Sequence, residues 1–234
     1  MTYADFKDKV MLSMEDICRD IFHENRETIK VKKEAVVVKN LVNIYDATLR
    51  LSNKKGFHSM SLRELAKETN LSLGALYSYF ENKDQLLGII QEQGYRITGR
   101  LLEAEIDKSP DPVKKLDIAI RTHLYLSESM QPWFYFFFME AKNLDKEKQK
   151  TVITSELYTE QIFADILNLG VQAGVFSTGN IQLTASLIKS MLQDWYLKRW
   201  KHTKRKISVD EYAEFVVKFV LQALGGAQQE DFKD

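Results

Sequence analysis

The sequence predicts an all-α protein with about ten helices and no strand. The 10 glycines and 3 prolines among 234 residues are about half of the average share, so few positions can turn a hairpin. Apolar residues recur at helical spacing along almost the whole chain, and the interruptions have the composition of helix caps. With 44% hydrophobic residues, a chain of this length can bury about 70% of its unfolded surface. A sizeable helical core is therefore expected.

The composition also limits the chemistry. The 33 basic and 33 acidic residues give a formal net charge of +0, so a nucleic-acid surface has to come from local segregation of charge. Cys18 is the only cysteine, which excludes an internal disulfide framework and a cysteine-pair zinc site. The four histidines fall on separate predicted segments, and no nucleophile motif or glycine-rich phosphate loop accompanies them. We expect no enzyme activity, no metal site and no cofactor.

The first residues do not have the pattern of a targeting signal. They carry acids where a signal peptide needs a basic start, and their apolar runs are too short for an h-region. No segment approaches the roughly 18 apolar residues of a membrane span. The expectation is a cytoplasmic protein that does not enter a membrane.

Two long helices are expected before residue 60. The first spans about residues 4–24 and carries one apolar stripe through Val10, Met14 and Ile21. The second spans about residues 32–54 and ends near Gly56, where a residue with positive φ is easily placed.

Two short helices around a tight turn follow, and then a long helix. Ser61 and Glu64 have the spacing of a capping box for the first short helix. Ser72 can cap the second short helix, and Asn82 can cap the long one, which runs to about residue 107. This order is typical of a helix-turn-helix head joined to a helical body.

The remaining helices are expected at about residues 111–128, 132–143, 145–173, 180–202 and 208–224. Prolines occupy the first positions of two of them. Ser208 and Glu211 form a second capping box, and the pair Gly225-Gly226 ends the last helix.

The stretch from Ser61 to Leu86, SLRELAKETNLSLGALYSYFENKDQL, resembles the DNA-binding head of the TetR family of transcriptional regulators. The resemblance covers about residues 32–90 and is carried by Ser61, Leu65-Ala66, Leu71-Ser72, Gly74, the run from Leu76 to Phe80, and Lys83. The family usually has glycine where this chain has Asn70, and asparagine tolerates a positive φ better than other non-glycine residues. The resemblance divides the chain into an N-terminal extension helix (1–29), a helix-turn-helix DNA-binding domain (30–90) and a ligand-binding and dimerisation domain (91–234).

The resemblance also implies which residues of the head contact double-stranded DNA. The expected phosphate contacts are Ser61, Tyr77, Tyr79 and Lys83. Ser72 faces outward at the start of the recognition helix, and the residues nearest the base edges are Leu73, Ala75 and Ser78. None of these can make a bidentate base contact, so specificity is expected from methyl contacts, Arg63 and DNA shape.

Charge agrees with this orientation of the head. Residues 28–55 contain seven basic and two acidic residues, a local net charge of +5. A solvated lysine-rich helix explains such a run by itself. Next to the helix-turn-helix pattern, we favour phosphate contact for some of these lysines.

The body beyond residue 91 is interpreted from its own residues. The run from Trp133 to Met139 is apolar around the whole helix circumference, more than one packing face requires. Core packing accounts for any single ring, whereas together the rings could line an apolar effector cavity. The candidate lining residues are Trp133, Phe134, Phe137, Phe138 and Trp195, and the candidate polar partners are His123, Tyr158, Gln161 and Asp194. Each polar candidate also fits an internal or a surface role.

The last two helices are apolar over more than one face, whereas an outer helix of a monomer keeps a polar face. Their apolar residues include Leu183, Leu187, Ile188, Met191, Phe215, Val216, Phe219 and Val220. By resemblance, these helices form a four-helix homodimer interface with their mates. A dimer sets two recognition helices about 34 Å apart or somewhat more, matching the half-sites of a palindrome.

The run from Lys198 to Lys206 contains six basic residues and no acidic one. Cations at a helix C-terminus followed by a solvated loop account for it. The alternative is a site for an anionic effector headgroup, such as that of an acyl-CoA.

Two functional hypotheses result. The first is a ligand-responsive repressor that a small apolar effector, for example an acyl-CoA or a fatty-acid-like molecule, releases from a palindromic operator. The alternative is a helical interaction module without sequence-specific DNA binding. The N-terminal extension has three open roles: packing on the head, extending the DNA contacts, or binding a partner.

Overall fold

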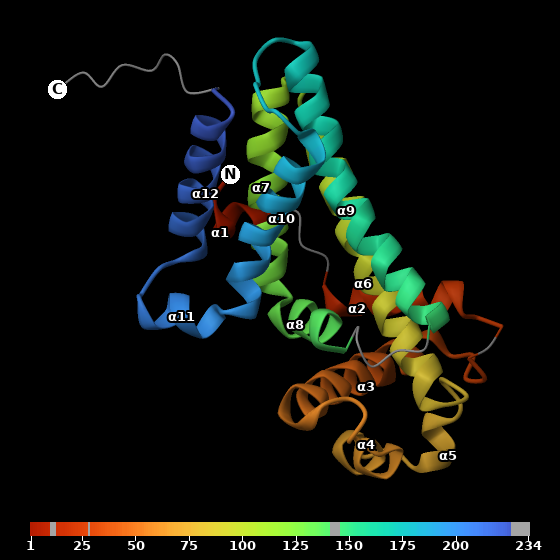
Figure 1. Cartoon of the computed structure of the whole chain (residues 1–234). Helices are drawn as coiled ribbons and strands as arrows, with labels where there is room; N and C mark the ends of the chain where they lie inside the picture. The colour runs from red at the N-terminus through yellow and green to blue at the C-terminus, as the bar shows by residue number, and fades with distance from the viewer. Residues whose placement is uncertain (10–12, 28, 141–145, 226–234) are drawn as a thin grey trace. The chain divides into compact units, whose positions relative to one another are not determined.

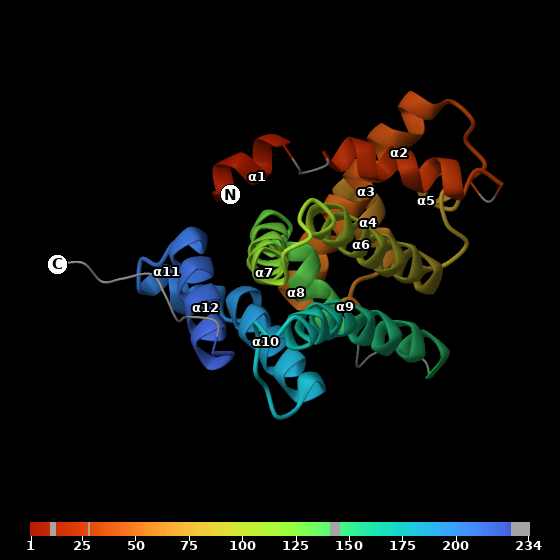
Figure 2. The same cartoon turned by 90° about the horizontal axis from the view of Figure 1, so that it is seen from above.

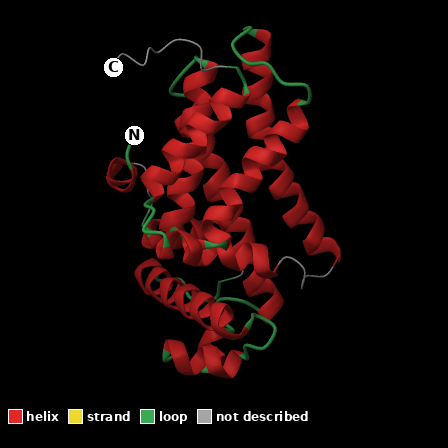
Figure 3. Cartoon of the chain, turned by 60° about the vertical axis from the view of Figure 1, so that its left-hand side comes forward, coloured by secondary structure: helices red, strands yellow, loops and turns green. Residues whose placement is uncertain are grey.

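A computed structural model describes residues 1–9, 13–27, 29–140 and 146–225. This part of the chain forms twelve helices and no strand (Figure 3). The all-α prediction is confirmed. Within the described ranges, none of the helices has both the length and the apolar character needed to span a bilayer.

The chain divides into two compact units, each assembled from separate stretches of sequence. We call the unit of residues 11–97 and 132–152 the head unit, and the unit of residues 1–10, 98–131 and 153–234 the body unit. Each unit contains helices from distant parts of the chain, and the domain limits predicted at residues 29 and 90 stay a prediction.

The head unit is organised around α3. It contains α2 (Met14–Glu24), α3 (Glu34–Lys55), α4 (Leu62–Thr69), α5 (Leu73–Leu76), the first part of α6 (Lys83–Ile106) and most of α8 (Gln131–Glu140). Helix α2 lies along α3 (Figure 2) and buries four residues: Ile17, Cys18, Ile21 and Phe22. Helix α4 packs on α3 as well.

The body unit is organised around α7 (Pro112–Ser129), which is flanked by α10 and α12 (Figure 1). The unit also contains α1 (Tyr3–Lys9), the last part of α6 and most of α9 (Lys146–Gln172). It ends with α10 (Ile181–Leu197), α11 (Arg199–Lys204) and α12 (Val209–Ala223). Helix α7 buries nine residues, most of them apolar. One of the nine, His123, has a titratable side chain.

The predicted helix starts are confirmed where their caps are described. The side-chain oxygens of Asn82 and Asp111 each accept a backbone N–H at the start of α6 and α7. Ser208 and Glu211 form the predicted capping box of α12. These short-range bonds explain why the boundaries were readable from sequence, since they involve residues only two or three positions apart.

The single helix predicted over residues 4–24 is wrong, because the chain forms α1 and α2 instead. Ser13 Oγ accepts a hydrogen bond from the Asp16 N–H at 3.1 Å, and the Asp16 carboxylate accepts one from the Ser13 N–H at 3.3 Å. This capping box starts a new helix. Its signal was present in the sequence, but the apolar spacing continues through it. Val10, part of the predicted stripe, lies outside the described residues.

The helix predicted over residues 180–202 also ends early. Helix α10 stops at Leu197 because Lys198 adopts φ −118° and ψ 34°, outside helical geometry, and α11 begins at the next residue. The basic run therefore spans a helix break and a short helix.

Helix α1 is part of the body unit's core. Phe6 is fully buried and its ring lies 5.8 Å from that of Tyr125. The Tyr3 N–H and the Tyr125 hydroxyl both donate to Asp210 Oδ1, at 2.9 and 2.6 Å. The start of the chain is thereby held to α7 and α12.

Candidate DNA-binding head and effector-binding residues

The first helix of the motif, α4, begins at a complete capping box. Ser61 Oγ accepts from the Glu64 N–H at 3.2 Å, and the Glu64 carboxylate accepts from the Ser61 N–H at 2.9 Å. Lys55 donates to the same carboxylate at 2.5 Å. These hydrogen bonds lower the pKa of Glu64 to about 2, and the bond from Lys55 has the largest effect. Ser61 and Arg63 are both exposed at this helix start.

The turn between α4 and α5 depends on Asn70. This residue adopts the left-handed conformation with φ 55°, so the prediction that asparagine replaces the family's glycine in the turn is confirmed. From α3, Asn43 donates through its side-chain amide to the Thr69 carbonyl at 2.7 Å. That bond satisfies a carbonyl at the end of α4 that the helix itself cannot use.

The recognition helix α5 presents its predicted base-facing side outward. Ser72 Oγ caps the helix by accepting from the Ala75 N–H at 3.1 Å. Tyr77 is 44% exposed, whereas Leu76 is fully buried beneath it. The outward set is exposed or partly exposed and consists of Ser72, Leu73, Ala75, Tyr77 and Ser78. The structure therefore leaves all five of these predicted residues at least partly accessible, which contact with a major groove requires.

Tyr79 and Lys83 make internal contacts that the sequence did not predict. Tyr79 is only 3% exposed, and its hydroxyl accepts a hydrogen bond from the Asn40 side chain at 2.6 Å. Lys83 donates to the His58 carbonyl at 2.8 Å and lies 4.7 Å from the centre of the Phe57 ring. Partial burial lowers the pKa of Lys83. Both side chains hold the head together, and their contact with phosphates stays a prediction.

The nine predicted effector-binding residues divide between the two units. Trp133, Phe134, Phe137 and Phe138 belong to the head unit, whereas His123, Tyr158, Gln161, Asp194 and Trp195 belong to the body unit. Neither unit by itself contains the whole predicted set. Within the head unit, α8 contacts α3 through Tyr45 and α6 through Tyr95.

In the head unit, the aromatic residues of α8 form a dense cluster. The Trp133 ring meets those of Tyr45 and Phe137 edge to face, with centroids 6.0 and 5.9 Å apart. Phe137 also stacks on Tyr95 at 5.4 Å. Its ring fills the space above Gly94, where a Cβ atom would overlap it. Phe138 points away and is 48% exposed.

Besides Ser52 Oγ, two polar groups are buried in this unit without a hydrogen-bond partner among the described residues. They are Nε1 of Trp133 and Nε2 of Gln91, and their residues are only 2% and 4% exposed. A buried donor without a partner costs free energy, so both groups can gain by donating to an acceptor on a bound molecule.

A buried polar cluster in the body unit was missed from sequence. Lys189 in α10 is 4% exposed; its Nζ lies 3.2 Å from the Glu156 carboxylate and also donates to the Thr159 hydroxyl. Burial lowers the pKa of Lys189. Burial, helped by the charge of Lys189, holds the pKa of His123 well below its usual value, so His123 is neutral at pH 7. The sequence carried one sign of this cluster, a lysine within an otherwise apolar helix. Helical periodicity by itself assigns such a lysine to the surface.

Asp194 is engaged by three neighbours rather than open to a ligand. Its carboxylate lies 2.9 Å from Lys198, 2.5 Å from Lys201 and 3.1 Å from His202 Nε2. Burial acts to raise the pKa of Asp194, but these three hydrogen bonds outweigh it and lower the pKa to about 2.

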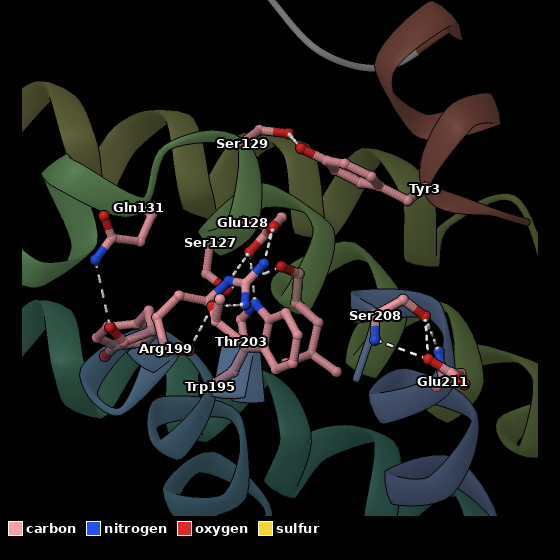
Figure 4. A network of polar contacts seen from close by, with 12 residues as sticks. Tyr3, Ser127, Glu128, Ser129, Gln131, Trp195, Arg199, Thr203, Ser208 and Glu211 are labelled. Carbon is pink, nitrogen blue, oxygen red and sulfur yellow. Dashed lines mark hydrogen bonds and ion pairs between the residues drawn. The ribbon is translucent and has the colours of Figure 1, made fainter. Parts of the chain in front are cut away.

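Trp195 is fully buried next to a bidentate ion pair. Figure 4 shows its indole Nε1 donating to Glu128, at 2.9 Å, while the Arg199 guanidinium donates to both oxygens of that carboxylate. Arg199 also lies over the Trp195 ring at 4.6 Å. Three of the six basic residues of the run, Lys198, Arg199 and Lys201, thus form ion pairs within the unit. The other three, Lys204, Arg205 and Lys206, are exposed.

Tyr158 and Gln161 lie on the surface of α9. Tyr158 is 44% exposed, and its hydroxyl donates to Glu103. That bond raises the pKa of Tyr158 to about 12. Gln161 is exposed and donates to Asp165 at 2.7 Å.

A capped helix pair with a left-handed turn and an outward-facing second helix defines a helix-turn-helix DNA-binding protein. The model for bacterial regulatory proteins of the tetR family matches residues 44–88, and the model for the tetracyclin repressor-like C-terminal domain matches residues 109–224. Together the two models cover well over half of the chain. This protein belongs to the TetR family of transcriptional regulators.

Known proteins agree with this assignment. The HTH-type transcriptional regulator HbdR of Aromatoleum sp. strain CIB is 21% identical over 171 residues, which are 73% of this chain and 74% of HbdR. The crystal structure of a tetR-family regulatory protein from Rhodococcus RHA1 superposes with a TM-score of 0.74 at 22% identity, over 81% of this chain and 99% of that chain.

Two similar structures contain coenzyme A esters. FadR of Bacillus subtilis in complex with stearoyl-CoA has a TM-score of 0.63 at 19% identity, over 80% of this chain and all of that chain. AibR in complex with isovaleryl coenzyme A and operator DNA has a TM-score of 0.67 at 18% identity, over 80% of this chain and 98% of that chain. At these identities the likeness shows the fold.

Proposed function

We propose that this protein is a homodimeric repressor that binds a palindromic operator and is released by a small apolar effector. The observation that carries the proposal is the outward-facing surface of α5, on which Tyr77 stands 44% exposed over a buried core. The protein acts in the cytoplasm, by binding rather than by catalysis.

The dimer surface consists of exposed apolar residues on α10 and α12. Leu183 and Leu187 of α10 and Phe215 and Phe219 of α12 are 53% to 67% exposed. The two phenylalanine rings stack at 6.3 Å. A contiguous apolar surface is unfavourable in water unless a partner covers it, and a two-fold copy of the same surface can do so.

The effector is an acyl-CoA or a fatty-acid-like molecule. FadR and AibR bind stearoyl-CoA and isovaleryl coenzyme A, and both have the fold of this chain. The aromatic cluster of α8 supplies apolar surface, and the buried donors of Trp133 and Gln91 would pair with an acceptor such as a thioester carbonyl.

Release from DNA follows from differential affinity. An effector that binds best to a conformation with a poor head arrangement shifts the population away from the DNA-bound form. By linkage, operator DNA weakens effector binding by the same factor.

The DNA-binding claim is tested by fluorescence anisotropy on the gene's upstream duplex, with a scrambled duplex as competitor. Tyr77→Ala should weaken operator binding at least tenfold, because Tyr77 projects from the recognition surface. Tyr158→Ala is the matched control, since both tyrosines are 44% exposed. Equal affinity of the wild-type protein for operators selected from random duplexes and for scrambled DNA would favour a helical interaction module.

The effector claim is tested by adding acyl-CoAs of increasing chain length to the protein–operator complex. Release of DNA should depend on the acyl chain, and free coenzyme A should have no effect. An acyl-CoA that binds equally well with and without operator is excluded as the inducer.

The dimer claim is tested by sedimentation. The double variant Leu187→Glu with Phe219→Glu should be monomeric, because it places charge in the apolar surface. The control variant Ile153→Glu with Leu157→Glu changes two residues that are both 56% exposed on α9 and should remain dimeric. A dimer that survives the first variant contradicts the assigned interface.

A further inference from the structure

The segment of residues 29–33, IKVKK, joins α2 to α3 and contains three lysines and no acid. It lies outside the family model for the head, which begins at residue 44. It belongs to the head unit, so its position relative to the recognition helix is defined within one compact unit.

This segment is attached to the end of the recognition helix. The Lys30 N–H donates to the Ser78 carbonyl at 2.9 Å, and Ser78 is one of the outward-facing residues of the DNA surface. Ile29 is 1% exposed and anchors the segment in the core. The Lys30 side chain therefore starts from a backbone position that is fixed next to the DNA-reading surface.

The three lysines have different roles. Lys32 Nζ donates to the carbonyls of Arg26 and Ile29, at 2.8 and 2.9 Å, and so stabilises the turn itself. Lys30 and Lys33 are exposed, and neither pairs with a carboxylate of any described residue. The adjacent acid, Glu34, is already held by Arg19 at 3.3 Å.

We infer that Lys30 and Lys33 form a second phosphate-binding site, which extends the DNA surface beyond the recognition helix. Two ammonium groups that pair with no carboxylate of a described residue, on a segment anchored by Ile29 and by the bond from Lys30 to Ser78, suit the regularly spaced phosphates of a duplex. The inference rests on the proposed DNA-binding function. It assigns the segment after α2 to the DNA contact surface, in addition to the packing of α2 on α3.

The test is the double variant Lys30→Gln with Lys33→Gln, measured by anisotropy across a salt series. Both substitutions keep the backbone N–H of residue 30, so the bond to Ser78 is retained. Each lost phosphate contact should reduce the slope of log K against log salt by about 0.9. Because the double variant removes two lysines, the slope should fall by about 2 for each chain that binds the DNA. Operator and scrambled duplex should weaken by the same factor, because phosphates carry no sequence information.

The control variant Lys204→Gln with Arg205→Gln removes the same charge from two exposed residues of the body unit, and its salt slope should match the wild type. Lys30→Arg with Lys33→Arg should restore the slope. Thermal unfolding confirms that each variant is folded.

An unchanged slope in the Lys30/Lys33 variant, or an equal change in the control, overturns the inference. Failure of the proposed function has a different signature: the wild-type protein then shows no preference for any duplex. The slope comparison can still be made on scrambled DNA in that case. A wild-type protein that binds no DNA overturns both.

Discussion

Two tryptophans are buried to the same degree in this protein, but their surroundings differ. Trp133 in the head unit is 2% exposed among Tyr45 and Phe137, and its indole N–H has no acceptor among the described residues. Trp195 in the body unit is 0% exposed, and its N–H donates to Glu128. Burial without a partner is costly, whereas a charge-assisted bond offsets that cost. The indole N–H of Trp195 is thus satisfied within its own unit, whereas the indole N–H of Trp133 has no acceptor among the described residues.

The largest effect is expected from Trp195→Ala. Removing a fully buried indole should cost about 3–5 kcal/mol of unfolding free energy, measured by urea denaturation. Trp200→Ala is the control, because that ring is 69% exposed and should change stability little. Similar losses for both variants would show that burial in this unit does not determine stability.

A smaller loss is expected where the head cluster is tightest. In Gly94→Ala, the new Cβ overlaps the Phe137 ring, and overpacking of this kind costs about 1–3 kcal/mol. Gly88→Ala has open space within 4 Å and should stabilise α6 by about 0.5–1 kcal/mol. The unfolding free energies of the two variants can be compared by denaturant unfolding, and adding Phe137→Leu should recover part of the stability lost in Gly94→Ala. Equal changes in unfolding free energy at both glycines would contradict the close contact between Gly94 and the Phe137 ring.

The ion pairs around Asp194 should make the stability of the protein depend on pH. The pKa of Asp194 is about 2 in the folded protein against 3.8 for an ordinary aspartate. Its contribution to stability is therefore present above about pH 4 and lost as the pH falls towards 2, by about 2 kcal/mol at most. Asp194→Asn should flatten the stability profile over this range, whereas Asp165→Asn, on the surface of α9, should not. An unchanged profile in Asp194→Asn would contradict the assigned pairs.

The smallest effect on stability is expected at the outer edge of the head cluster. Phe138 is 48% exposed, so Phe138→Ala should change the unfolding free energy by no more than about 0.5 kcal/mol. The same variant should weaken the response of the operator complex to acyl-CoA if Phe138 contacts the effector. A large loss of stability would place Phe138 in the core.

Local signals were predicted well. Ser61, Asn82, Asp111 and Ser208 each cap a helix as expected, because capping bonds join residues two or three positions apart. The same rule applies to the boundary that was missed at Ser13, where the apolar period concealed a capping box. The break at Lys198 was also missed, and Lys198 makes no side-chain cap there. The motif that carries the TetR resemblance was equally local, within residues 61–86.

The role of the candidate effector residues stays a prediction, and their surroundings could not be predicted from sequence because they depend on long-range contacts. Asp194 and Trp195 stood out in the sequence, but their polar atoms already have partners. The Asp194 carboxylate pairs with Lys198, Lys201 and His202. The Trp195 indole N–H donates to Glu128, as Figure 4 shows. Lys189 was overlooked, although it is the most deeply buried lysine in the described part of the chain.

By itself, the sequence determined the helical class, the capped boundaries and the position of the helix-turn-helix motif, because each depends on residues that are close together in the chain. Only the tertiary structure decided that α1 belongs to the body unit and α2 to the head unit. It also decided that Tyr79 and Lys83 support the head from within, and that Lys30 lies at the end of the recognition helix. These facts depend on which distant surfaces pack together, and an apolar stripe records that a helix needs a partner without recording which one.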